Sequence, residues 1–168
     1  MSQPAEPFFA RYTRLVTETD LVTTMREQGR ELERLFRSIP ASDADKLHGR
    51  YTWTPKQVVG HIIDAERVFG YRAMRFARAD ATPLPGFDEN AYVAHAGSER
   101  RALASLAEEF AGLRQSHVAM FSAFPPDVWI RTGTASNITW AITDLAKAII
   151  GHARHHETIL RQRLGGAV

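Results

Sequence analysis

The chain has 168 residues, of which 44% are hydrophobic and 24% charged, a size and balance that predict a globular protein with its own core. It contains no cysteine, which excludes disulfides, thiolate zinc sites, iron–sulfur clusters and a cysteine nucleophile, so any metal must be held by His, Asp or Glu. Its 21 Lys and Arg nearly balance its 19 Asp and Glu, and acids alternate with arginines over 26–37, which argues against nucleic acid as a partner. No apolar stretch reaches the ~18–20 residues of a membrane helix, and residues 1–15 lack the apolar run of a signal peptide, so we expect no membrane partner and a cytoplasmic location.

Four segments carry apolar residues at helical spacing, and all but the second end at a proline or at a pair of glycines. The second segment has the clearest beginning. Thr54 stands at the N-cap, Pro55 at the first helical position and Gln57 three residues after the cap. In chain order the predicted helices span 20–39, 54–79, 98–124 and 139–164.

The segments between these helices are rich in turn residues, and we expect 80–97 and 125–138 to be long loops. No part of the sequence shows the sustained alternation of a strand bounded by hairpin signals. The pattern therefore predicts an all-α four-helix bundle in one domain, 1–168, with a core at about 17–165. The long connections permit crossovers, and the order of packing is left open.

Three of the seven histidines fall where a bundle core would place apolar side chains. His61 lies at the edge of the apolar stripe of the second predicted helix, beside Ala65. His152 and His156 lie on the inward face of the last helix, one turn apart, whereas His155 falls outside that face.

Two inward histidines at positions i and i+4, joined by a third from another helix, are typical of a three-nitrogen metal site with coordination positions left open. The alternative is that all three are buried core histidines with hydrogen-bond partners and no metal. A zincin motif is excluded, because Leu160 stands where the second histidine of HExxH would be. A di-iron carboxylate bundle is also excluded, since no histidine has a glutamate three residues before it.

Several segments resemble the DinB/YfiT-like superfamily of metalloenzymes. They are GHIIDAERVFGYRAMRFARAD at 60–80, PLPGFDENAYV at 83–93, GHARHHETILRQRL at 151–164, and the Trp53-Thr54-Pro55 entry to the second helix. The resemblance implies a four-helix bundle with a crossover connection and one divalent metal held by His61, His152 and His156. In such proteins the metal is usually zinc or nickel, with manganese or iron as further candidates. A set of three imidazole ligands does not determine which of these metals binds.

The resemblance also implies a type of chemistry. Better-understood members of the superfamily are thiol S-transferases and thiol-dependent isomerases that use low-molecular-weight thiols such as bacillithiol or mycothiol. We therefore expect a metal-dependent transferase acting on a small-molecule substrate, with the thiol as cosubstrate. Two alternatives remain open: a hydrolase in which the metal activates water, and a non-catalytic, stress-related binding bundle. A homodimer is compatible with a small bundle, although no particular residue specifies one.

Further candidates lie near these histidines in helical phase. Asp64 and His117 are candidates to support the metal ligands through hydrogen bonds, with a surface acid and a core histidine as the respective alternatives. Arg72 lies on the His61 face three turns on, where it would either meet a substrate carboxylate or pair with an acid. Aromatic residues that would line a pocket at the bundle opening are Trp53, Phe87, Trp129 and Trp140.

Overall fold

The computed structural model describes residues 9–165. The expected domain, 1–168, extends beyond this range at both ends. Gly166, the second of the two glycines that follow the last predicted helix, also lies outside it. The elements are α1 (Ala10–Thr13), α2 (Leu21–Ser38), α3 (Ala41–Ala44), α4 (Pro55–Ala77), α5 (Glu89–His95), the 3-10 turn η1 (Ser98–Arg100), α6 (Leu103–Ser122), α7 (Pro126–Trp129), β1 (Thr132–Ala135), β2 (Ile138–Ala141) and α8 (Ile142–Arg163).

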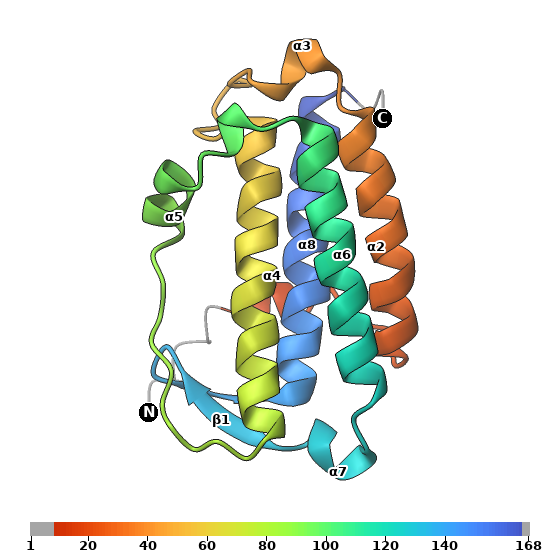
Figure 1. The fold of residues 1–168 in the computed structure, drawn as a ribbon, viewed down its shortest axis with the longest axis vertical. Coiled ribbons are helices and arrows are strands. Elements are labelled where there is room, and N and C mark those ends of the chain that lie inside the picture. The colour runs from red at the N-terminus through yellow and green to blue at the C-terminus, as the bar shows by residue number, and fades with distance from the viewer. Residues whose placement is uncertain (1–8, 166–168) are drawn as a thin grey trace, which may run out of the picture.

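The four long helices form the predicted bundle, in an order that does not follow the chain. The closely packed pairs are α2 with α6, α4 with α8, α4 with α6, and α2 with α8. Consecutive helices α2 and α4 are not among these pairs and occupy opposite corners. Helices α4 and α6 run in the same direction, and α2 and α8 run in the opposite one (Figure 1). The connection from α4 to α6 therefore crosses the length of the bundle, which confirms the expected crossover.

Local capping sets the beginnings of two bundle helices close to where the sequence predicts them. The Asp20 side chain accepts a hydrogen bond from the backbone amide of Thr23 at 3.0 Å and caps α2. At α4, Thr54 and Gln57 form the expected reciprocal capping box with Pro55 at the first position. Each cap satisfies amide groups that have no partner within the helix, so these boundaries are local properties of the chain.

The expectation that no strands form was wrong for 132–141. These residues form an antiparallel hairpin in which Ala135 pairs with Ile138 across a two-residue turn. The turn residues Ser136 and Asn137 have φ values of 53° and 60°, as a type I′ turn requires. β2 ends directly at α8, so the last helix begins at Ile142 rather than near residue 139.

The connection from α4 to α6 also contains structure that differs from the expected loop at 80–97 and the expected continuous helix from residue 98. Helix α5 lies within 80–97, its first turn capped by the Asp88 side chain. Leu84 makes a parallel bridge to Ala135 and ties this crossing segment to the hairpin. Residues 98–100 form a separate 3-10 turn, so α6 begins at Leu103.

A layer of buried polar side chains crosses the bundle between its two apolar clusters. The Glu66 carboxylate accepts from Arg114 Nη2 at 2.8 Å and lies 3.3 Å from His117 Nδ1. Arg114 Nη1 also donates to Gln28 Oε1 at 2.9 Å, and Gln28 Nε2 donates to the carbonyl of Ile150 at 2.9 Å. This chain of hydrogen bonds joins α2, α4, α6 and α8 at one level along the bundle.

In the described part of the chain, none of the helices has the length and hydropathy of a membrane span.

Candidate metal centre

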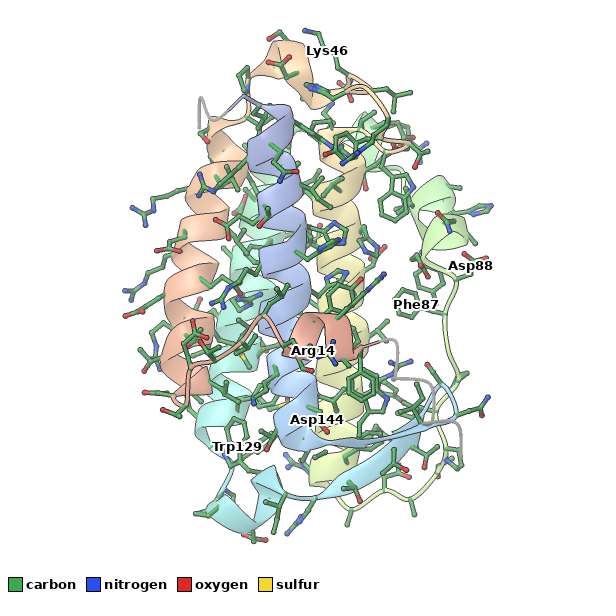
Figure 2. The ribbon with its side chains drawn as sticks, turned by 180° about the vertical axis from the view of Figure 1, so that it is seen from behind. Arg14, Lys46, Phe87, Asp88, Trp129 and Asp144 are labelled. Atoms are coloured by element: carbon green, nitrogen blue, oxygen red, sulfur yellow. The ribbon has the colours of Figure 1, made fainter. Side chains whose placement is uncertain are left out.

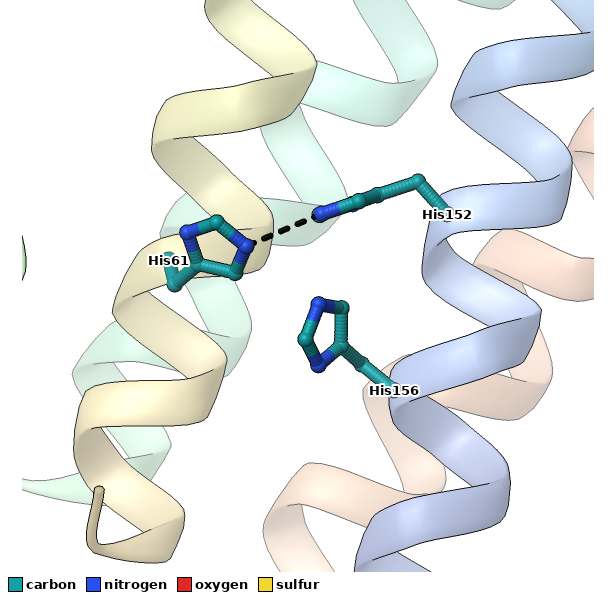
Figure 3. Close-up of side chains that lie close together, drawn as sticks. All are labelled: His61, His152 and His156. Carbon is teal, nitrogen blue, oxygen red and sulfur yellow. Dashed lines mark hydrogen bonds between the residues drawn. The ribbon is translucent and has the colours of Figure 1, made fainter. Parts of the chain in front are cut away.

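His61 on α4 and His152 and His156 on α8 lie together where these two helices pack. One potential ligand atom from each falls within 4.8 Å of the other two. The Nε2 atoms of His61 and His152 are 2.9 Å apart. The ring centroid of His156 lies 4.8 Å from that of His61 and 4.6 Å from that of His152. Figure 3 shows the three rings turned toward a common centre.

These imidazoles are buried and neutral at pH 7. Each is less than a tenth exposed. Burial lowers the pKa of His61 from 6.5 to about 4. Burial, followed by the charges of the neighbouring histidines, holds the pKa values of His152 and His156 well below the ordinary value. A neutral imidazole keeps a lone pair available, and this is the form that binds a metal.

The arrangement of donor atoms fits a transition metal. Nitrogen ligands about 2.0–2.1 Å from a tetrahedral zinc lie about 3.3 Å apart. The observed separations start at 2.9 Å, between His61 and His152, and all fall within 4.8 Å. The buried Nδ1 atoms of His61 and His156 also lack a hydrogen-bond partner within the described part of the chain. A metal bound through Nε2 would leave these Nδ1 atoms without a partner just as a structural role does, so the convergence of the three rings, not the unpartnered atoms, favours the metal site.

The structure places the supporting candidates elsewhere. The Asp64 carboxylate lies 3.7 Å from Arg67 Nη1, near the surface, and burial raises its pKa. His117 is buried beside Glu66 in the polar layer and does not belong to the three-histidine group. His155 lies next to His156, with ring centroids 5.0 Å apart, and is likewise not a member of that group.

The three histidines open onto a cavity of about 470 Å³. Of the aromatic residues expected at such a pocket, Trp53, Phe87 and Trp140 line it. Figure 2 shows Phe87 pointing from the crossing segment toward the bundle, and Trp129, the last residue of α7, toward the lower end of the molecule. Trp129 instead packs against Phe121, at a centroid distance of 5.5 Å. The centre thus has access to a largely aromatic chamber.

Several residues that complete this cavity are not among those expected from the sequence. Tyr12 of α1 lies edge-on to His152 at 5.1 Å, and its exposed neighbour Arg11 also reaches the cavity. Glu89 comes from α5, and Ser136 from the turn of the hairpin. These residues lie on short elements that only long-range packing brings to the site. The sequence drew attention to only one of these segments, the PLPGFDE motif at 83–89, and its last residue, Glu89, lines the cavity.

The sequence model of the DinB superfamily matches residues 24–160, and the chain belongs to this superfamily. The fold is similar to that of YfiT from Bacillus subtilis, with a TM-score of 0.74 and 17% sequence identity over 98% of this chain and 94% of that one. YfiT is described as a probable metal-dependent hydrolase with an unusual four-helix bundle topology. No curated protein matches the sequence.

Proposed function

We propose that this protein is a metal-dependent enzyme in which His61, His152 and His156 hold one divalent transition metal, with zinc or nickel favoured. The observation that carries this proposal is the convergence of three buried, neutral imidazoles on the wall of a cavity of about 470 Å³. Three protein ligands leave coordination positions open to that cavity, as catalytic sites do. A cavity of this size suits a small-molecule substrate.

The chemistry we favour is transfer of a low-molecular-weight thiol to that substrate. A divalent metal with open positions lowers the pKa of a bound thiol or water and so supplies a nucleophile at neutral pH. The chain has no cysteine, so a thiol nucleophile has to arrive as a cosubstrate. The aromatic walls, including Trp53 and Phe69, would hold the substrate and exclude water. Hydrolysis is the second candidate, and the similarity to YfiT, itself described as a probable hydrolase, favours it.

Metal content tests the site directly. Elemental analysis by ICP-MS would be made on protein purified without a His-tag or a nickel column. We expect about one equivalent of a transition metal in the wild type and in His155→Ala, and little in His156→Ala. His155 is the matched control because it is adjacent on the same helix but outside the three-histidine group. A wild type that neither carries nor takes up zinc, nickel or manganese would overturn the proposal and leave a non-catalytic binding bundle.

A cobalt-loaded sample separates the two chemistries. Direct binding of mycothiol or bacillithiol through sulfur would give an intense near-ultraviolet charge-transfer band, which His156→Ala should lack. We expect this band if the protein is a thiol transferase. If neither thiol changes the spectrum, while the loaded wild type hydrolyses an activated ester such as p-nitrophenyl acetate and His156→Ala does not, the hydrolase is the better assignment.

A further inference from the structure

Among the residues that the structure describes, two arginines are buried, and their surroundings differ. Arg114 is 2% exposed and Arg72 is 3% exposed. Arg114 forms a buried ion pair with Glu66. Arg72 forms no ion pair with any described residue, and its hydrogen bonds go only to the carbonyl of Pro85 and to Ser136 Oγ, both at 2.9 Å. A buried cation without a counter-ion is costly, so it calls for an explanation.

Arg72 faces the same cavity as the three histidines. His61, Ala65, Phe69 and Arg72 are spaced to form one face of α4, and all four line the cavity. At 1.5 Å per residue, the eleven positions from His61 to Arg72 span about 16 Å along the helix axis. The cavity therefore has imidazoles at one end, a guanidinium at the other, and the small Ala65 and apolar Phe69 between them.

The guanidinium of Arg72 is held in place through one of its nitrogens, and its other nitrogens are left to bind a ligand. Both of its hydrogen bonds come from Nη2, and the described structure shows none from Nε or Nη1. The acceptor Ser136 sits at the turn of the hairpin with a φ of 53°, a conformation that side-chain-bearing residues adopt at a cost. Neither the carbonyl nor the hydroxyl carries charge. These contacts orient Arg72 without neutralising it.

The other charged residues of the cavity do not compensate Arg72. Glu89 lines the cavity, and its charge acts on the pKa values of His61 and Tyr12 at the opposite end. Burial alone lowers the pKa of Arg72, with no contribution from an acid. The remaining cation, Arg11, is exposed and donates to the Tyr12 hydroxyl. The field at the Arg72 end is therefore positive, and it favours an anion.

We propose that Arg72, steadied by Ser136, binds a carboxylate at one end of the substrate, whose apolar body lies along Ala65 and Phe69 and whose reacting group lies at the histidines. A single guanidinium matches the charge of one carboxylate, and the hydrogens on Nη1 and Nε of Arg72 are not used by Pro85 or Ser136 and can be donated to it. The substrate class, an elongated apolar molecule with a terminal carboxylate, rests on the proposed function. The anion site itself does not, because it needs no metal.

Calorimetric titration with octanoate and with 1-octanol tests this inference, since the two probes share a chain and differ in charge. For the full-length protein as purified, we expect octanoate to bind at least tenfold more tightly than octanol. Arg72→Met should remove most of this preference, because a hydrogen bond to a charged group contributes at least this much. Arg72→Lys should retain part of it. Arg78→Met is the control, since it removes an exposed arginine from the end of the same helix.

The outcomes separate this inference from the metal centre. The same titration on His156→Ala should still show the preference for octanoate, even though the metal site is lost. If octanoate and octanol bind the wild type equally, or if Arg72→Met folds and keeps the preference, the anion site is wrong. If Arg72→Met does not fold, the wild-type comparison and Arg72→Lys decide. A preference for octanoate in a protein that binds no metal would support the anion site while overturning the proposed enzyme.

Discussion

Buried polar side chains in this bundle fall into two groups with different partners. Glu66, Arg114 and His117 satisfy one another inside the polar layer. The three clustered histidines and Arg72 instead face the cavity, and the buried Nδ1 atoms of His61 and His156 lack partners within the described chain. Polar groups that neither reach solvent nor satisfy one another lower stability, so sites that retain them are candidates for function.

The neutral histidines predict how the stability of the metal-free protein depends on pH. In the unfolded chain each histidine titrates near 6.5, whereas burial lowers the folded pKa of His61 to about 4 and holds the pKa values of His152 and His156 well below the ordinary value. Between these values the unfolded chain binds more protons. The free energy of unfolding should therefore be highest above pH 6.5 and fall as the pH drops toward 4, by about 1.4 kcal/mol per pH unit for each histidine.

Urea unfolding of metal-free protein at pH 7.5, 6.0 and 5.0 measures this slope. His61→Phe should make it shallower, because one of the titrating groups is removed. His95→Ala serves as the control, since it removes a histidine that is exposed on α5 and outside the three-histidine group. An unchanged slope in His61→Phe would contradict a buried, neutral His61.

At the scale of single elements, the sequence predicts the long helices well and the short elements poorly. The boundaries of α4 follow from Thr54 and Gln57, whose capping bonds are local. The hairpin has strands of only four residues, and it is supported by the bridge from Leu84 to Ala135, a contact between distant segments. Neither Ser136 nor Asn137 is glycine, so the usual sequence signal for a type I′ turn is missing.

The same division explains which parts of the candidate site could be predicted. His61, His152 and His156 lie on long helices, so helical phase alone indicates which side each one faces. Tyr12 and Ser136 come from a four-residue helix and a turn. Their presence at the cavity depends on where these elements dock, and periodicity carries no information about docking.

Helix α1 docks on α8 at a glycine, which gives a prediction for this pair of elements. A Cβ atom at Gly151 would lie 2.0 Å from the backbone carbonyl oxygen of Tyr12, so Gly151→Ala has to push α1 away from α8. We expect a loss of about 1–3 kcal/mol in the free energy of unfolding, as for other overpacked sites. Octanoate binding should also weaken, because Tyr12 forms part of the cavity wall.

Gly112→Ala provides the matched control in a bundle helix. Nothing lies within 4 Å of a Cβ atom built at Gly112, which is exposed on α6. This substitution should raise the free energy of unfolding by up to about 1 kcal/mol through helix propensity and leave octanoate binding unchanged. Equal effects of the two substitutions, measured by urea unfolding, would rule out a close contact between α1 and α8.

In the molecule as a whole, the crossover topology decides what the candidate centre can join. Helices α4 and α8 are neighbours in space although another bundle helix, α6, lies between them in the chain (Figure 1). His61 and His152 are 91 residues apart in sequence, and their Nε2 atoms meet at 2.9 Å. A metal bound there would link two antiparallel helices that pack together in space but lie far apart in the sequence. The unfolded chain does not hold His61 beside His152 and His156, so metal binding should favour the folded state.

Zinc should therefore raise the thermal unfolding midpoint of the metal-stripped protein. At a free zinc concentration a hundred times the dissociation constant, binding adds about 2.7 kcal/mol to the free energy of unfolding. For a protein of this size, that corresponds to an increase of about 5–10 °C in Tm. Differential scanning calorimetry should show this shift in the wild type and in His155→Ala, whereas His156→Ala should respond much less. Magnesium, which prefers oxygen ligands, should have no effect on any of the three. A zinc shift of equal size in His156→Ala would mean that zinc stabilises the fold from somewhere other than the junction of α4 and α8.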